Sequence, residues 1–150
     1  MKIEENCSIK DINSLRINQR AKYLCSIETV EQFLEAIEFS KLKNLPILYI
    51  GEGSNIVFTK DYDGLVIKNN MLGKIEHDER IVEIFSGENW HKFVDWSLSN
   101  ERYGLENLAL IPGTVGASPI QNIGAYGKEV SAFIKEVKSI NTLTAEERIF

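Results

Sequence analysis

The sequence predicts an α+β fold of two lobes, and three observations support this prediction. A strand, a helix and another strand follow one another between residues 21 and 63. After residue 63 the pattern changes to short strands around one further helix. The composition, 43% hydrophobic and 26% charged, is that of an ordinary globular chain. We therefore expect an N-terminal lobe over residues 1–63 and a second, incomplete lobe over residues 64–150.

The N-terminal lobe is predicted to be a βαβ unit. Residues 23–27 fit a short strand, and Thr29 then begins a helix in which Gln32 completes a capping box. Apolar side chains recur at helical spacing until Asn44-Leu45-Pro46 ends the helix. The apolar run Ile47-Leu48-Tyr49-Ile50 indicates a buried strand. A unit of this length predicts two parallel strands with the helix covering one face.

The second lobe is predicted from weaker patterns. Gly64–Ile67 and Arg80–Phe85 fit short strands, and Val137–Leu143 fits another. A helix is predicted from Glu88 to Asn100, because its large apolar side chains recur on one face. No element is predicted for Thr144–Phe150.

Charge and hydropathy argue against several classes of protein. Seventeen basic side chains against 22 acidic ones leave a net charge of −5, whereas nucleic-acid-binding proteins carry an excess of Lys and Arg. The N-terminal stretch MKIEENCSIKDINSL has acidic residues where a signal peptide has basic ones. No apolar run approaches the roughly 20 residues that span a bilayer. We expect a cytoplasmic protein that binds neither nucleic acid nor membrane.

Cysteine and histidine usage argues against metal and disulfide chemistry. Cys7 and Cys25 are the only cysteines, too few for a disulfide framework. Neither has a second cysteine or a histidine at a metal-ligand spacing, and His77 and His91 are isolated. We expect reduced, partly buried thiols and no metal site.

The first candidate site is Gly51-Glu52-Gly53-Ser54-Asn55, directly after a predicted strand. Two glycines permit a tight turn, in which successive amide N–H groups can converge on a phosphate. The spacing matches neither the GxGxxG nor the Walker nucleotide motif, and no lysine follows at the Walker position. A plain turn remains the alternative interpretation.

The second candidate is the uncharged segment Leu108–Gly127, LALIPGTVGASPIQNIGAYG. It holds four of the ten glycines and two of the three prolines. A long apolar loop usually packs against another surface, and its glycines permit close approach of the backbone to a ligand. Ser118, Gln121 and Asn122 add neutral hydrogen-bonding groups that suit a planar heterocycle or a diphosphate. The alternative is a buried crossover between the lobes.

No catalytic constellation is evident among the side chains of residues 1–150. Ser118 has no predictable histidine beside it, and no lysine or metal cluster is predicted near the phosphate loop, which argues against phosphoryl transfer. Two neutral glycine-rich loops suit a large cofactor with a diphosphate, which would carry the chemistry.

Three blocks in this order carry a resemblance to a known family: GEGSN after a strand, then GENWHKFV, then GLENLALIPGTVGASPIQNIGAYG. Together they resemble the UDP-N-acetylenolpyruvoylglucosamine reductases of peptidoglycan synthesis, over about residues 13–150. The SPIQN form resembles the subgroup with the longer substrate domain. Asn13-Ser14 stands where the family usually has Asn-Thr.

The resemblance implies a flavoprotein with a two-lobed FAD-binding domain of the vanillyl-alcohol-oxidase (PCMH) type. FAD would be noncovalent, with NADPH as its reductant, and hydride would pass to the enolpyruvyl double bond of a UDP-sugar to give UDP-N-acetylmuramate. Gly51–Asn55 would cradle the pyrophosphate, and the later segment would line the remaining diphosphate and the isoalloxazine. The residues expected to contact FAD are Gly51, Glu52, Gly53, Ser54, Asn55, Gly113, Gly116, Ala117, Ser118, Gln121, Asn122, Gly124, Ala125, Tyr126 and Gly127.

The family's substrate-polarising arginine, proton-donating serine and assisting glutamate have no matching positions in residues 1–150, where the C-terminal substrate domain is absent. No catalytic residue is therefore assigned here, and the chain alone is expected not to turn over. A C-terminal fragment is an expected partner. The alternatives are a non-catalytic flavin- or nucleotide-binding module and an unrelated flavin oxidase of the same fold.

Overall fold

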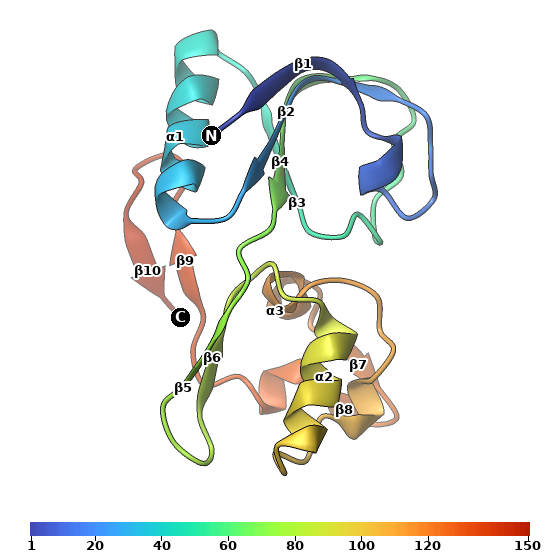
Figure 1. Cartoon of the computed structure of the whole chain (residues 1–150), viewed down its shortest axis with the longest axis vertical. Helices are drawn as coiled ribbons and strands as arrows, with labels where there is room; N and C mark the ends of the chain where they lie inside the picture. The colour runs from blue at the N-terminus through green and yellow to red at the C-terminus, as the bar shows by residue number, and fades with distance from the viewer.

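A computed structural model describes residues 1–150, and its N-terminal part is a four-stranded sheet with one helix (Figure 1). The strand order is β1-β2-β4-β3. Strand β1 is antiparallel to β2, whereas β2 and β3 both run parallel to β4, which lies between them. The bounds are β1 Ile3–Ser8, β2 Arg20–Ile27, β3 Ile47–Ile50 and β4 Tyr62–Asn69.

Helix α1 (Val30–Lys43) forms where the sequence predicts it. The Thr29 hydroxyl accepts a hydrogen bond from the Gln32 amide N–H at 3.3 Å, and the Gln32 side chain accepts one from the Glu28 N–H at 2.8 Å. Asn44 ends the helix with a φ of 51°, a left-handed conformation that Asn tolerates. The helix covers one face of the sheet, and the core between them is Cys25, Ile27, Phe33, Ala36, Ile37, Leu65 and Ile67.

The assignment of residues 64–67 to the second half was wrong, because this strand is part of β4 in the N-terminal sheet. Leu65, Val66 and Ile67 are fully buried, since α1 covers one face and a second apolar cluster covers the other. A continuous apolar run is typical of a strand buried on both faces. The second cluster contains Ile9, Ala21, Ile50, Phe58 and Val66.

The C-terminal part lies below the sheet in Figure 1 and has its own core. That core joins α2 to the segments that follow it and consists of Trp90, Val94, Leu108, Ile123 and Val130. The elements are the hairpin β5 Lys74–Glu76 and β6 Val82–Ile84, the helices α2 Trp90–Ser99 and α3 Ser118–Gln121, and the hairpin β7 Gly124–Ala125 and β8 Lys128–Glu129. Short 3-10 helices span Lys10–Ile12, Glu106–Leu108, Val115–Ala117 and Val130–Ala132.

The chain then returns to the N-terminal part, and this return was not predicted. Strands β9 (Lys138–Ile140) and β10 (Glu147–Ile149) form an antiparallel hairpin beside α1 (Figure 1). Ile140 packs against the core under α1, and the Lys41 ammonium donates to the Leu143 carbonyl at 2.9 Å. The two parts of the molecule are therefore joined by two chain segments, one after β4 and one before β9.

Both cysteines carry free thiols, Cys7 half-buried and Cys25 buried. Neither α1 nor any other helix has the length and apolar character needed to cross a membrane.

Candidate functional site

The first predicted loop, Gly51–Asn55, lies at the carboxyl end of β3, beside the end of β4. In sheets with parallel strands, ligands bind outside the carboxyl ends of the strands. Gly53 is buried with a φ of 65° and lies directly on the segment around Asn13. The Ser14 N–H and hydroxyl both donate to the Gly53 carbonyl, at 3.1 and 3.3 Å. Asn13 in turn donates to the Ile9 and Ile17 carbonyls, which holds this supporting segment in place.

The backbone N–H groups of residues 52–55 are not used by the protein. None of them donates a hydrogen bond to a protein acceptor, and the hydroxyl of Ser54 and the side-chain amide of Asn55 form none either. Of these residues only Gly53 is buried, whereas the other three are partly or fully exposed, so their N–H groups are open to solvent or to an external acceptor. Such a run is the donor set that a diphosphate requires.

The second predicted segment meets this loop, and Glu52 joins them. One carboxylate oxygen accepts the Gly113 N–H at 3.0 Å, and the other accepts the side-chain amide of Asn89. Gly51 packs so closely on Thr114 that a Cβ would lie 2.6 Å from the Thr114 hydroxyl oxygen. The structure therefore brings Gly51–Asn55 together with the beginning of the second candidate.

The N-terminus of α2 fixes the second segment. Asn89 caps the helix by accepting the Lys92 N–H at 2.8 Å. The Trp90 N–H donates to the Gly113 carbonyl at 2.9 Å, and the Val115 N–H donates to the Glu88 carbonyl at 2.8 Å. The GENWHKFV block is therefore the support on which residues 113–115 rest.

Gly116, Ala117, Ser118 and Gln121 lie close to this junction. Gly116 packs against Ser86, where a Cβ would approach the Ser86 Cβ to 2.5 Å. The buried Ser118 hydroxyl donates to the Val115 carbonyl at 2.8 Å, so it serves the local turn. Ala117, Ser118 and Gln121 line a crevice together with Gly113 and Thr114, and this crevice is too narrow to hold a water molecule.

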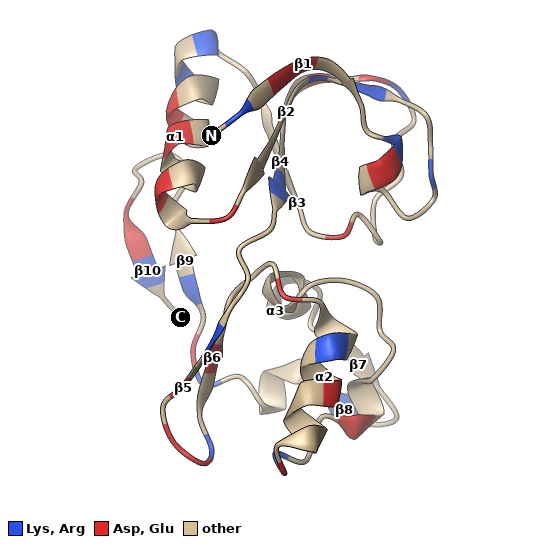
Figure 2. Cartoon of the chain, in the orientation of Figure 1, with Lys and Arg blue, Asp and Glu red and all other residues tan.

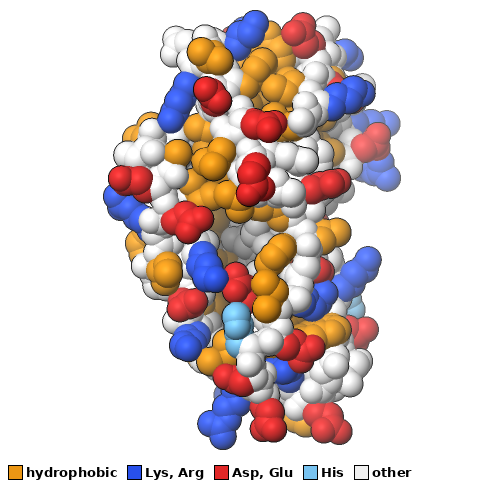
Figure 3. All heavy atoms as spheres, turned by 60° about the vertical axis from the view of Figure 1, so that its left-hand side comes forward, with side chains coloured by type: hydrophobic (Ala, Val, Ile, Leu, Met, Phe, Trp, Pro, Cys, Tyr) orange, Lys and Arg blue, Asp and Glu red, His pale blue; other side chains and the backbone are white.

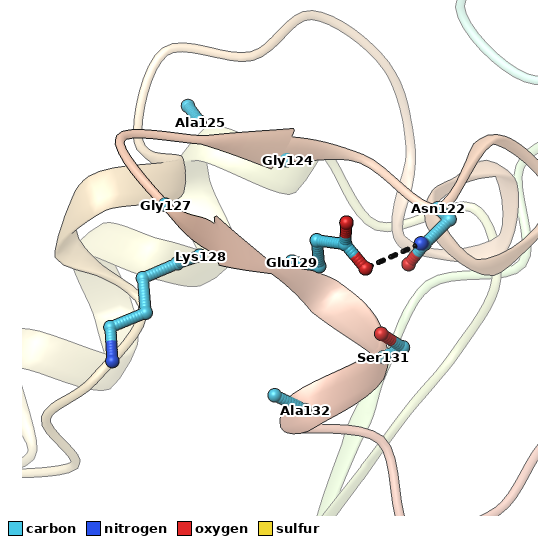
Figure 4. Close-up of a pocket in the computed structure, with 8 residues that line it drawn as sticks. All are labelled: Asn122, Gly124, Ala125, Gly127, Lys128, Glu129, Ser131 and Ala132. Atoms are coloured by element: carbon cyan, nitrogen blue, oxygen red, sulfur yellow. Dashed lines mark hydrogen bonds between the residues drawn. The ribbon is translucent and has the colours of Figure 1, made fainter.

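The remaining predicted residues lie elsewhere: Asn122 ends α3, and Gly124–Gly127 belong to the β7–β8 hairpin (Figure 4). Tyr126 and Gly127 form its turn with φ values of 50° and 75°, and the Tyr126 side chain is exposed. An open hollow of about 790 Å³ is lined by Asn122, Gly124, Ala125, Gly127 and residues of β8 and the following 3-10 helix. The Asn122 amide points to Glu129 and donates to it at 2.9 Å. No hydrogen bond joins this hairpin to Gly51–Asn55.

Sequence reasoning missed Lys68. The sequence predicts no lysine near the phosphate loop, but β4 places Lys68 there, and its ammonium donates to the Gly51 carbonyl. Burial lowers the pKa of Lys68, and the nearby charge of Glu52 partly opposes this. Lys68 pairs in the parallel sheet with Ile50, the residue before Gly51. This strand pairing is the only signal that could have revealed that Lys68 lies at the loop.

The second candidate segment contains no charged residue. Figure 2 shows an uncoloured ribbon along the segment through α3 to β7, which has no Asp, Glu, Lys or Arg between residues 108 and 127. On the face shown in Figure 3, hydrophobic side chains gather at mid-height around a hollow, with acidic and basic side chains beside them. A segment without charged side chains, next to a loop with free amide donors, suits a large uncharged ring system that carries an anionic group.

Sequence comparison identifies relatives over almost the whole chain. A family model described as FAD binding domain matches residues 21–150. A UDP-N-acetylenolpyruvoylglucosamine reductase of Burkholderia multivorans is 44% identical over 142 residues, covering 92% of this chain and 41% of its own length. The enzyme of that name from Escherichia coli is 42% identical over 145 residues, covering 95% of this chain and 42% of its own length. The chain thus spans about two fifths of the length of these curated relatives.

Solved structures give the same fold. The UDP-N-acetylenolpyruvylglucosamine reductase of Thermus caldophilus superposes with a TM-score of 0.80 at 22% identity, over all of this chain and 52% of that one. A p-cresol methylhydroxylase superposes with a TM-score of 0.65 at 16% identity, over 87% of this chain and 27% of that one. The predicted α+β fold of the vanillyl-alcohol-oxidase type is confirmed. The chain belongs to the FAD-binding domain family, and its sequence relatives are UDP-N-acetylenolpyruvoylglucosamine reductases.

Proposed function

We propose that this chain is the FAD-binding portion of a UDP-N-acetylenolpyruvoylglucosamine reductase. The observation that carries the proposal is the junction of two glycine-rich segments at Glu52, beside a run of amide donors without protein partners. The identity of 42–44% to reductases of this name supports the same assignment. The two FAD-binding lobes would divide after Asn69, where the chain leaves the sheet.

The residues at the junction fit a noncovalent FAD. The N–H groups of residues 52–55 would bind the diphosphate, with the Ser54 hydroxyl as a further donor. Gly113 presents backbone at a φ of 129°, and a Cβ there would meet only the Ser54 hydroxyl oxygen, at 3.5 Å. The neutral segment through Ser118 and Gln121 would face the flavin ring. The β7–β8 hairpin would contribute to FAD binding only at its outer edge.

The complete enzyme would use the flavin as its hydride carrier between NADPH and the enolpyruvyl group of a UDP-sugar, in the cytoplasm, for peptidoglycan synthesis. The role of residues 1–150 is to bind and orient the cofactor. Polarisation of the substrate and proton donation need a positioned cation and a positioned acid. We place these groups in the remaining portion of the enzyme, so this chain alone would hold FAD without turning over substrate.

A visible absorption spectrum of purified residues 1–150, recorded after mixing with FAD and gel filtration, tests the proposal. We expect flavin bands that elute with the protein. A folded protein that retains no flavin and does not quench flavin fluorescence would refute FAD binding by this chain.

NADPH and the UDP-sugar then separate the reductase from a non-catalytic binding module. With a C-terminal fragment of a relative added, the reductase portion would show bleaching of the flavin by NADPH and recovery of its colour with the UDP-sugar. A binding module would hold FAD and show neither change. Flavin that is reduced without any recovery by the UDP-sugar would favour another flavin enzyme.

A further inference from the structure

Lys68 occupies a position that the fold makes directly adjacent to the phosphate loop. It is paired in β4 with Ile50, the residue that precedes Gly51. Val66, two residues earlier, and Ile50 both belong to the apolar cluster on the sheet face opposite α1, so the Lys68 side chain leaves from that face. Its ammonium donates to the Gly51 carbonyl at the start of the loop.

The charge of Lys68 has no ionic partner in the structure. Lys68 is half-buried, yet it takes part in none of the ion pairs of the chain. Most lysines are exposed, and a partly buried cation bound only to a neutral carbonyl is unfavourable. The lowered pKa of Lys68, which burial causes, agrees with this description.

The nearest acidic group does not satisfy Lys68. The Glu52 carboxylate is occupied by the Gly113 N–H and the Asn89 amide, one on each oxygen. Its charge acts on Lys68 only over a distance, without a salt bridge. The site therefore holds a cation without a salt-bridge partner, beside a run of amide N–H groups that donate to no protein acceptor.

We propose that Lys68 is the cationic partner of the diphosphate at this site, releasing the Gly51 carbonyl or sharing its ammonium between the two acceptors. The inference rests on the proposed function, because it concerns the same loop. It adds a side-chain charge from a different strand to a cradle otherwise built from neutral backbone. A charged hydrogen bond is worth more than a neutral one, so Lys68 sets a large part of the affinity for the anion.

The test compares Lys68→Met with wild type, with Lys68→Arg and with Lys43→Met. Methionine keeps the apolar stem of the side chain and removes the charge, arginine keeps the charge, and Lys43 is an exposed lysine near the end of α1. FAD affinity is measured by flavin fluorescence at low and high salt. We expect Lys68→Met to weaken FAD binding about tenfold or more and to reduce its salt dependence. Lys68→Arg and Lys43→Met should stay within about twofold of wild type.

Thermal unfolding without FAD separates this role from a structural one. Removing an unpaired, half-buried charge should leave the Tm of Lys68→Met unchanged or raised. A clear fall in Tm with unaltered salt dependence of FAD binding would mean that Lys68 supports the loop and does not meet the anion.

Inorganic pyrophosphate provides a probe that does not depend on FAD. We expect it to shift the amide NMR signals of residues 52–55 in wild type and not in Lys68→Met. If FAD binds equally to both proteins, the inference is wrong and the proposed function stands. If wild type binds pyrophosphate through Lys68 but not FAD, the anion site stands and the proposed cofactor is wrong. If wild type binds neither, both proposals fall.

Discussion

Gly53→Ala tests how the phosphate loop keeps its shape. In the structure Gly53 has a φ of 65°, and a Cβ there would lie 2.2 Å from the Ile12 carbonyl oxygen and 2.9 Å from the Asn13 Cα. Both contacts are with backbone, so no side-chain rotation can relieve them. The glycine is thus required by the segment beneath the loop, in addition to any requirement of a bound phosphate.

The expected cost has two parts. A left-handed conformation costs a residue with a Cβ about 1–2 kcal/mol relative to glycine. Moving the backbone of residues 12–13 away from the new methyl group costs about 1–3 kcal/mol more, as for an overpacked core. The free energy of unfolding should therefore fall by about 2–5 kcal/mol in Gly53→Ala.

Gly127→Ala is the matched control. Gly127 has a similar φ of 75°, but nothing lies within 4 Å of its added Cβ. This variant carries only the conformational cost, and the change in the unfolded chain is the same for both glycines. The difference between the variants isolates the contact with residues 12–13, which should lower Tm by about 2–12 °C beyond the control.

Urea and thermal unfolding followed by circular dichroism give the two stabilities, and FAD titration of the folded variants gives the effect on the site. We expect Gly53→Ala to bind FAD more weakly than Gly127→Ala, because its loop must move. Equal losses of stability in the two variants would refute the packing argument.

Three further predictions concern groups at or near the site. Glu52→Gln should lower the free energy of unfolding by about 1–3 kcal/mol, because an amide replaces a charged acceptor of the Gly113 N–H; an unchanged urea midpoint would contradict this. Burial raises the pKa of Cys25 to about 11, so above pH 9 the unfolded chain loses a proton that the folded chain keeps. Stability should fall between about pH 9 and pH 11, and Cys25→Ala, measured by the same pH series of urea titrations, should lose less. Trp90→Phe removes the indole N–H that donates to the Leu108 carbonyl at 2.7 Å and should cost about 2–4 kcal/mol by thermal unfolding, with a loss below 1 kcal/mol contradicting the assignment.

The elements with local signals were predictable from the sequence. Thr29 and Gln32 fixed the start of α1, Asn44 fixed its end, and the apolar run 47–50 formed β3 as expected. These features depend on hydrogen bonds and hydrophobic periodicity within a few residues, which a sequence displays directly.

The elements that depend on distant partners were not predictable. Strands β1 and β10 carry few buried residues and are defined by their pairing, so periodicity does not reveal them. The strand predicted at Val137–Leu143 is present as β9, but its pairing with β10 was not predicted. The strand around residues 64–67 was recognised, but its place between β2 and β3 follows from tertiary packing.

The candidate site was predictable as two glycine-rich segments and not as an arrangement. The phosphate nest at residues 52–55 stays a prediction. The role of Glu52 as the link to Gly113, and the approach of Lys68 from β4, depend on which strand lies beside which loop. Gly124–Gly127 are close to the junction in sequence, but the fold places them away from it, on the β7–β8 hairpin.

The two chain segments that join the parts of the molecule restrict how these parts can move relative to each other. One segment follows β4 and the other precedes β9. A single connecting segment would permit rotation about any axis, whereas two separated segments restrict rotation about axes that do not pass through both. Rotation of the C-terminal part should therefore be easiest about the axis through both segments, and such a rotation would also have to break the hydrogen bonds from Gly113 and Asn89 to Glu52.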